Sequence, residues 1–387
     1  NASDKDNKRM TSGTAFEFGT FERQLGYGYF QDPSRYPEMK LEGPIVNRRA
    51  EAPFFLLPGL PRRTLIGTLA EIDYYASDDL VAGVVVNLSG VRASAEMLWE
   101  IREQLAGFRA AGRKVIVYFD DVGLSQYALA SVADEVWMDP EGVMWMPGIS
   151  LGRTYYAEAL EKVGVGVEEF RIMKYKSLME TFVRSSMSEA DREQYSALVD
   201  DIYAEFAEAA TTGRDIGSDE WDRIIDEEWL ITPRRARELG LVDSVGTWDD
   251  AKRSAREAER RPSGDPSYAE LGTVFGDRDW SGYAWGPVPK IAILHAIGVC
   301  AMDEGIRARE LARAIRKEKD DWFTSAIVIR VDSPGGDGLA SDIVAREIRD
   351  AAEVKPVIVS QGNVAASGGY WISAPGDEIF ASPLTLT

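Results

Sequence analysis

Residues 356–373 read PVIVSQGNVAASGGYWIS, and this stretch decides the fold of the chain. Its beginning is apolar and β-branched, which is typical of a buried strand. A turn follows at 361–363, and Ser367 then stands between two alanines and two glycines. Small neighbours let another backbone come close, and a helix that begins there directs free N–H groups toward any negative charge. We therefore predict a strand-to-helix junction that exposes the Ser367 hydroxyl.

The pattern around this stretch occurs once before in the chain. Residues 83–90 read GVVVNLSG and resemble AIVIRVDS at 326–333, because each is a β-branched run that ends in turn residues. An amphipathic helix and a further strand follow each run, and Ser125 then falls at the position equivalent to Ser367. Strands that alternate with helices pair in parallel through right-handed crossovers. The sequence therefore predicts an α/β protein built from two tandem repeats.

This repeat divides the chain into four segments. We predict an N-terminal extension over 1–63, a first repeat over 64–250, a linker over 251–289 and a partial second repeat over 290–387. The linker is rich in charge, glycine and proline. The first repeat continues through a long helical region, whereas the second stops soon after its serine segment. Because a half-built repeat would expose a large apolar face, we expect the chain to be a fragment or incompletely covered.

Composition disfavours several classes of function. The 387 residues carry a formal net charge of −20, which repels nucleic acid. Cys300 is the one cysteine, so no intrachain disulfide forms. His295 is the one histidine and lies in an apolar, strand-like run, so we expect a core residue and no zinc site built on several histidines. We expect neither a metal nor a cofactor. No run approaches the ~20 apolar residues that cross a bilayer.

A serine nucleophile needs a general base and donors that hold the negative charge of the reacting oxygen. The strand at 326–333 ends in SPGG, where two glycines turn backbone N–H groups into a cleft that a side chain would block. We predict an oxyanion hole formed by the N–H groups of Gly336 and Gly368. Because the chain has a single histidine, we expect the base to be a lysine.

The candidate base lies in the segment MKYKSLMETF at 173–182. A lysine acts as a base only when its pKa falls from about 10.4 toward 7, through desolvation or a neighbouring cation. This segment offers both, since apolar residues surround Lys174 and Lys176 and the two lysines are close in sequence. The residues alone leave open which lysine serves, and whether both are ordinary surface lysines.

Together these motifs resemble the long, tandem-domain form of the signal peptide peptidase A (protease IV) family, serine peptidases with a Clp/crotonase-like fold. The resemblance runs from about residue 64 to the end and rests on these matches: Ser333–Gly336, Ala365–Ser373, Tyr175–Ser177 with Glu180 and Phe182, and Gly240–Ser244. Family members take the nucleophile from the second repeat and the lysine from the first. The resemblance therefore implies Ser367 as nucleophile and Lys176 as base, with Lys174 as the lesser candidate.

The sequence also departs from the family pattern. Thr181 stands where the family commonly has proline, and the family's chain continues well beyond Thr387. Ser125 lacks the two glycines that follow Ser367, and the turn before it lacks Pro-Gly-Gly, so we do not expect Ser125 to be catalytic. The first repeat is thus interpreted as a scaffold that donates the base to the second.

The resemblance implies a bacterial cell-envelope endopeptidase that cleaves apolar peptides, remnant signal peptides among them. It implies an inner-membrane anchor that precedes Asn1, a catalytic part outside the cytoplasm and a ring-like homo-oligomer. Two alternatives stay open. A crotonase-like acyl-CoA enzyme would act through carboxylates on the same fold, and a non-catalytic assembly or adaptor protein would keep the fold without chemistry.

A Ser-Lys mechanism makes the rate depend on pH. The base accepts a proton only when it is neutral, so peptidase activity is expected to rise with pH through the pKa of the base. The rate of hydrolysis of an apolar peptide between about pH 6 and about pH 10 measures this dependence. A flat profile over that interval argues against Lys176 as base.

Overall fold

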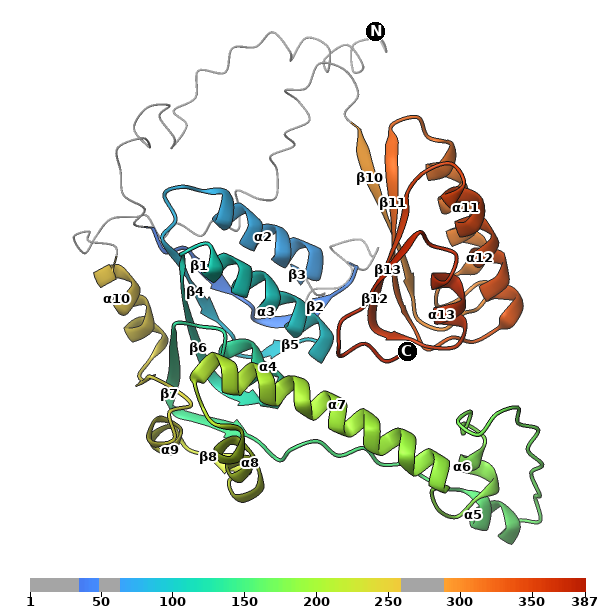
Figure 1. The fold of residues 1–387 in the computed structure, drawn as a ribbon, viewed down its shortest axis with the longest axis horizontal. Helices are drawn as coiled ribbons and strands as arrows, with labels where there is room; N and C mark the ends of the chain where they lie inside the picture. The colour runs from blue at the N-terminus through green and yellow to red at the C-terminus, as the bar shows by residue number, and fades with distance from the viewer. Residues whose placement is uncertain (1–34, 49–62, 259–288) are drawn as a thin grey trace, which may run out of the picture.

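The computed structural model describes residues 35–48, 63–258 and 289–387, which form the coloured ribbon of Figure 1. Most of the predicted N-terminal extension and of the predicted linker lies outside the described residues. The helix α10 (Trp248–Ala258) runs into the first residues of that predicted linker.

A largely parallel sheet forms the centre of the first repeat, and its edge strand, at residues 38–40, comes from the predicted N-terminal extension. Its strand order is β1 (Glu38–Lys40), β4 (Gly83–Asn87), β6 (Lys114–Gly123), β7 (Glu135–Trp145) and β8 (Leu230–Ile231), with β8 antiparallel and β9 (Ser244–Val245) parallel to β7. The valine-rich run of β4 is buried on both faces, as is usual in a parallel sheet covered by helices. A smaller sheet joins β3 (Arg63–Thr64), β2 (Gly43–Val46) and β5 (Val91–Arg92).

Helices cover both faces of this sheet. On one face lie α2 (Leu65–Ser77), α3 (Ala95–Ala110) and α4 (Leu124–Ala130), and α10 packs on the other against Val85 and Ile116. The side chain of Ser94 caps α3 by accepting a hydrogen bond from the Met97 N–H. Four apolar residues that share one face of this amphipathic helix are all buried: Met97, Ile101, Leu105 and Phe108.

The second repeat has the same strand order as the first. Its parallel sheet runs β10 (Lys290–Ile297), β11 (Thr324–Ser333), β12 (Val357–Ala365) and β13 (Glu378–Phe380), with helices α11 (Ala308–Asp320), α12 (Gly338–Ala352) and α13 (Gly368–Ser373). In α12, Val344 and Ile348 are buried, whereas Ile343 is partly exposed. The prediction of an α/β protein with parallel sheets is confirmed.

The long helical region predicted after the first sheet consists of separate helices. They are α5 (Ala157–Lys162), α6 (Glu180–Val183), α7 (Glu189–Arg214), α8 (Ser218–Glu227) and α9 (Pro233–Glu238). We call residues 150–188 the α5–α6 lobe. Figure 1 shows α7 extending from the first repeat to this lobe, which lies at the far end of the helix. Across the described ranges, no helix combines the length and apolar character needed to cross a bilayer.

A buried ionic cluster joins the two repeats. Arg330 of β11 donates to Glu100 of α3 over 2.7 Å and also pairs with Glu96 of the same helix. It further donates to the Ser360 hydroxyl over 2.8 Å. Burial first, and a hydrogen bond with Glu100 second, raise the pKa of Glu96 to about 8, against the opposing charge of Arg330. One cation thus holds two carboxyl groups that belong to the other repeat.

This cluster predicts that Arg330→Met loosens the contact between the repeats. Removing one partner of a buried ion pair leaves the other group uncompensated, which costs about 3–5 kcal/mol. Thermal unfolding followed by circular dichroism measures the expected drop in Tm. Arg346→Met is the control, because Arg346 is exposed on α12 and pairs only within that helix. Equal unfolding temperatures for both variants would show that the cluster does not hold the repeats together.

Candidate active site

Ser367 lies at the predicted junction, between the end of β12 and the start of α13. Its backbone has φ 52° and ψ −115°, a conformation that non-glycine residues rarely adopt. Its side chain is exposed. Strain of this kind persists only where the surroundings impose it, and a sharp strand-to-helix turn is how several hydrolases present a nucleophilic serine. The local structure therefore favours Ser367 as a nucleophile.

The glycine turn after β11 packs directly against this serine. A Cβ atom on Gly335 would lie 2.6 Å from the Gly368 nitrogen and 2.7 Å from the Ser367 Cβ. A Cβ atom on Gly368 would lie 2.4 Å from the Ser341 Oγ. Only glycine therefore allows the two turns to approach so closely. The structure brings together the SPGG and SGG motifs that the sequence analysis linked.

Two backbone N–H groups at this contact are not used by the hydrogen bonds of the described residues. Gly336 pairs with Cys300 in a parallel bridge, in which the Cys300 N–H donates to Gly335 and the Asp337 N–H donates to Cys300. In such a bridge the N–H of the central residue points to the opposite side. Within the described part of the chain it makes no hydrogen bond. Gly368 is the first residue of α13, so its N–H has no partner inside the helix.

Buried polar contacts hold the glycine turn in place. The Gly335 N–H donates to the Ser333 Oγ over 3.2 Å, and the buried Cys300 Sγ lies 3.4 Å from the same oxygen. Asp337 caps α12 by accepting from the Ala340 N–H over 2.7 Å. The turn is therefore fixed from both sides.

His295 takes no part in this site. It lies on β10 in register with Arg330, beside the inter-repeat cluster. Its buried Nδ1 has no hydrogen-bond partner among the residues that the structure describes. Burial first, and then the charges of Arg48 and Arg330, lower its pKa. It is a strand residue, as predicted, although its ring is only partly buried.

The two candidate lysines lie on the irregular part of the α5–α6 lobe. Lys174 forms a 3.2 Å ion pair with Glu193 of α7. Hydrogen bonds to Tyr175 and Glu193 raise the pKa of Lys174 above its usual value, which keeps it protonated and unsuited to accept a proton. Lys176 is exposed, and no hydrogen bond or ion pair among the described residues engages its ammonium group. Lys176 is thus the lysine more available to a reacting group.

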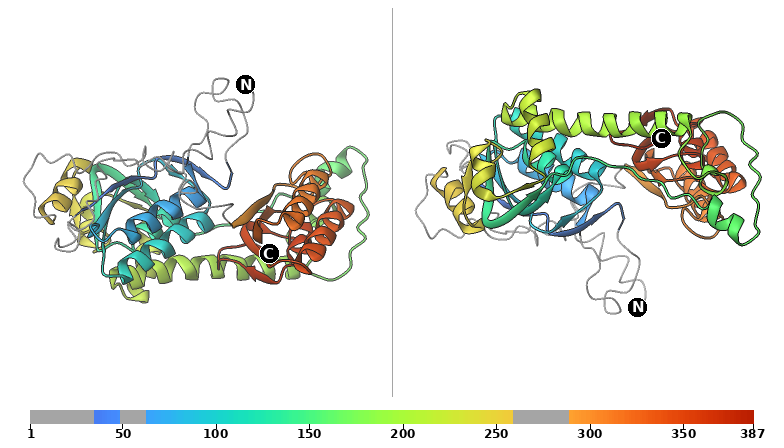
Figure 2. Two further views of the ribbon diagram at one scale, coloured as in Figure 1. Left: turned by 90° about the horizontal axis from the view of Figure 1, so that it is seen from above. Right: turned by 90° about the horizontal axis from the view of Figure 1, so that it is seen from below.

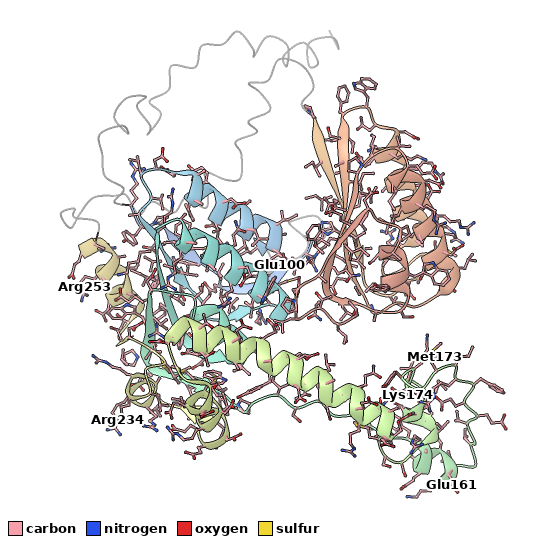
Figure 3. All side chains as sticks on the ribbon, in the orientation of Figure 1. Glu100, Glu161, Met173, Lys174, Arg234 and Arg253 are labelled. Carbon is pink, nitrogen blue, oxygen red and sulfur yellow. The ribbon has the colours of Figure 1, made fainter. Side chains whose placement is uncertain are left out.

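The structure does not bring Lys176 and Ser367 together within this chain. The α5–α6 lobe and α13 lie apart in Figure 1, and Figure 3 marks Lys174 and Met173 at the far end of α7. The views of Figure 2 look along the direction of this separation, so the lobe and the second repeat overlap there. Ser367 and Gly368 therefore lie against the glycine turn at 335–336, whereas the oxyanion hole and the dyad with Lys176 stay predictions.

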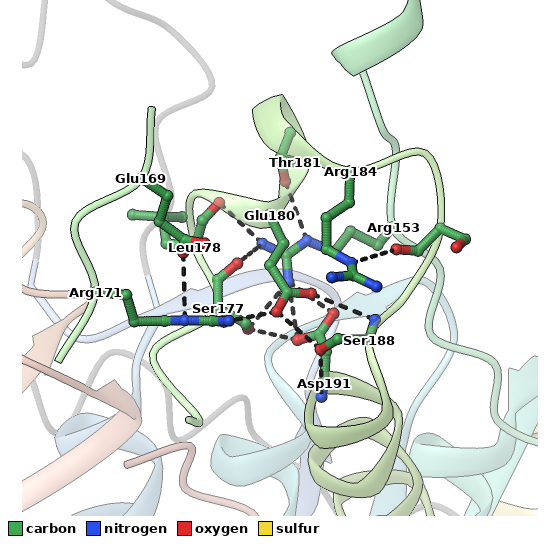
Figure 4. A network of polar contacts seen from close by, with 11 residues as sticks. Arg153, Glu169, Arg171, Ser177, Leu178, Glu180, Thr181, Arg184, Ser188 and Asp191 are labelled. Atoms are coloured by element: carbon green, nitrogen blue, oxygen red, sulfur yellow. Dashed lines mark hydrogen bonds and ion pairs between the residues drawn. The ribbon is translucent and has the colours of Figure 1, made fainter. Parts of the chain in front are cut away.

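Sequence reasoning missed a polar network at the base of the lobe, drawn in Figure 4. Arg153 and Asp191 are its centre, and Ser177, next to Lys176, is bound to both. The one available signal was Ser188 three residues before Asp191, a spacing typical of a helix N-terminus. That spacing predicts where α7 begins, but it does not predict that Asp191 is buried.

The fold and the site together define a class: an α/β protein that presents a strained serine beside two free N–H groups at the ends of parallel strands. The comparison with known sequences narrows this class. The chain matches Peptidase family S49 over residues 107–261 and 349–387, which together make up half of its length. It belongs to this family of peptidases.

Three relatives support the assignment. Serine protease SPPA, chloroplastic, of Arabidopsis thaliana is 30% identical over 81% of this chain and 47% of its own length. Protease 4 of Salmonella typhi is 30% identical over 85% of this chain and 55% of its own. Protease 4 of Haemophilus influenzae is 30% identical over 80% and 53%. The chain spans about half the length of these relatives.

The glycine contact predicts that Gly335→Ala destroys the site. The added methyl group meets the Gly368 nitrogen, and the φ of +92° is itself strained for alanine. We expect the rate at which a fluorophosphonate modifies Ser367 to fall by at least about 100-fold. Gly338→Ala is the matched control, because its Cβ would meet only Trp371, at 4.0 Å. Equal labelling of both variants would mean that the turn does not shape the site.

Proposed function

We propose that the protein is a serine endopeptidase that uses a Ser-Lys dyad, with Ser367 as nucleophile and Lys176 as general base. The observation that carries the proposal is the strained turn at Ser367, packed against the Gly335–Gly336 turn. Membership of a peptidase family supports it. Because the chain spans about half the length of its relatives, activity is proposed from the site and not transferred from them.

The proposed reaction proceeds through an acyl-enzyme. The Ser367 Oγ attacks the carbonyl carbon of a peptide bond while the neutral Lys176 Nζ takes its proton. The N–H groups of Gly336 and Gly368 hold the oxyanion of the tetrahedral intermediate. The intermediate collapses, and the leaving amine takes the proton from Lys176. Water then attacks the acyl-enzyme with Lys176 again as base, which releases the acid. These steps use no metal or cofactor.

The surroundings of Ser367 support an apolar peptide as substrate. Leu339, Tyr370 and Trp371 are exposed large hydrophobic residues at the starts of α12 and α13, the helices that follow the two turns of the site. An apolar chain laid across the nucleophile would cover them. Remnant signal peptides have this character, and they are the substrates that we propose. We further propose a location in the bacterial cell envelope, with membrane attachment through a segment outside this chain.

The proposed dyad requires the lobe and α13 to meet. This can happen by closure of one chain or by association of copies, and we propose a ring-like homo-oligomer. The lobe carries exposed apolar side chains that association would cover, with Phe170, Ile172 and Met173 the most exposed among them.

The two rival functions have less support. A crotonase-like acyl-CoA enzyme needs no strained serine, and an adaptor protein needs neither free N–H group of the site. Thioester turnover that survives Ser367→Ala would favour the first. An intact fold with no hydrolysis in any form would favour the second.

The experiment that tests the function compares hydrolysis of an apolar fluorogenic peptide by the parent protein, Ser367→Ala and Lys176→Ala. We expect both variants to lose activity by about 1,000-fold or more, because each removes a member of the dyad. Lys174→Ala and Ser125→Ala are the controls and are expected to keep the parental rate within a few-fold. Activity that survives Ser367→Ala would overturn the proposal.

Mixing the two inactive variants distinguishes closure from association. If Ser367 of one copy meets Lys176 of another, mixed oligomers contain intact sites and recover part of the activity. If the dyad forms within one chain, the mixture stays inactive.

A further inference from the structure

The segment that carries Lys176 has no regular secondary structure. Between α5 and α6 the chain forms only bends and turns, and Met173 within it adopts a positive φ of 74°. Such a segment cannot satisfy its own backbone groups through a helix or a sheet ladder, so other groups must bind them. The position of Lys176 therefore depends on whatever holds its neighbours.

Arg153 holds the two residues that follow Lys176. Its guanidinium donates to the carbonyl oxygen of Ser177 and, over 2.9 Å, to that of Leu178. It also donates to the Ser177 Oγ over 3.1 Å and to the Thr181 Oγ1 over 3.0 Å. Figure 4 shows these bonds meeting at the guanidinium of Arg153. A planar guanidinium with five donors suits this task, which a lysine could not fill.

Asp191 fixes Arg153 in turn. Its carboxylate is fully buried and accepts from Arg153 over 2.8 and 2.9 Å and from the Ser177 hydroxyl. It lies in the first turn of α7, where its own N–H donates to the Ser188 Oγ over 3.1 Å. A negative charge is favoured at a helix N-terminus. Asp191 therefore ties the backbone beside Lys176 to the long helix that reaches the first repeat.

A second buried carboxylate, Glu180, lies beside the Arg153–Asp191 pair (Figure 4). The buried Glu180 accepts from Arg171 over 2.6 Å and from the Ser188 hydroxyl over 2.8 Å. Burial acts to raise the pKa of Glu180, but the hydrogen bonds from Arg171 and Ser188 outweigh it and hold the pKa below its usual value. Arg171 and Glu180 stand before and after Lys176 in sequence, so the loop that carries Lys176 is closed at both ends.

We propose that Arg153 and Asp191 are positioning residues for the general base, acting on Lys176 through the backbone and side chain of Ser177. This inference rests on the proposed Ser-Lys function. In this proposal Arg153 and Asp191 do not contact the reacting atoms. They fix the backbone beside Lys176 and thereby the position of its side-chain nitrogen. A displacement of about 1 Å in such a group can cost about 100-fold in rate.

A purely structural role for Arg153 and a positioning role predict different effects of removing Arg153 when Lys176 is absent. If Arg153 merely keeps the lobe folded, its loss harms substrate binding and chemistry whether or not Lys176 is present. If Arg153 acts through Lys176, its loss has no further effect once Lys176 is gone. Residues that act as a unit are non-additive in this way.

The test is a double-mutant cycle in the whole protein, with Arg153→Met, Lys176→Ala and the two combined. The readouts are the rate at which a fluorophosphonate modifies Ser367, and kcat and KM for an apolar peptide. We expect Arg153→Met alone to lower kcat by about 10- to 100-fold with little change in KM. In the Lys176→Ala background it should change the residual labelling rate by less than about twofold.

Arg184→Met is the matched control. Arg184 follows α6 on the same lobe and is exposed, and its one contact within the described ranges is a hydrogen bond to the Ser186 carbonyl, so the parental rate is expected. If circular dichroism shows that Arg153→Met is misfolded, Asp191→Asn replaces it in the same cycle. This substitution keeps the volume and the acceptor for Ser177 but removes the charge that orients Arg153.

Equal losses in both backgrounds, or a parental kcat for Arg153→Met, would overturn the positioning role. A different result would contradict the proposed Ser-Lys function itself. A parental rate for Lys176→Ala would show that Lys176 is not the base, and both proposals would then be wrong. An inactive Lys176→Ala with additive effects of Arg153→Met would leave the dyad standing and remove only the positioning role.

Discussion

The site depends on one steric constraint: no side chain fits between the turn after β11 and the turn after β12. Gly335 lies against Ser367 and Gly368 at distances that leave no room for a Cβ atom. This contact packs the turn after β11 against the backbone of Ser367, whose conformation is strained. Because the two strands are parallel neighbours, their carboxyl ends meet at one edge of the sheet, which is where such folds place their ligands. The strand order therefore brings together the two turns that the proposed function uses as nucleophile and oxyanion hole.

Ion pairs and hydrogen bonds order the loop that carries Lys176, the proposed general base. Asp191 and Glu180 are buried, and each is matched by an arginine and a serine hydroxyl, so the irregular loop at Lys176 is ordered without a strand or a helix of its own. Buried ion pairs also join the two repeats, where Arg330 contacts both Glu96 and Glu100. Buried carboxyl groups are costly unless they are paired and hydrogen-bonded. Both clusters meet this condition, and both specify geometry more than they add stability.

Much of this architecture could be predicted from sequence. The β-branched runs at 83–90 and 326–333, and the face of α3, follow from periodicity, because a buried strand and an amphipathic helix each impose a local pattern. The junction at Ser367 was also predictable, because a run of alanines and glycines after a strand allows another backbone to come close. The network around Arg153 was not, because its partners are scattered over the chain and each looks like a surface residue alone. Periodicity also could not predict that residues 163–179 interrupt the helical region.

The separation of Ser367 from Lys176 has a chemical consequence within the proposed function. A serine hydroxyl without a base is a weak nucleophile, so the half-site on the second repeat has little reactivity by itself. The lysine is exposed on a lobe that lies at the far end of α7 from the first sheet (Figure 1). Bringing the two halves together desolvates the lysine and supplies the base in the same step. The proposed function therefore makes activity depend on closure of the chain or on association of copies.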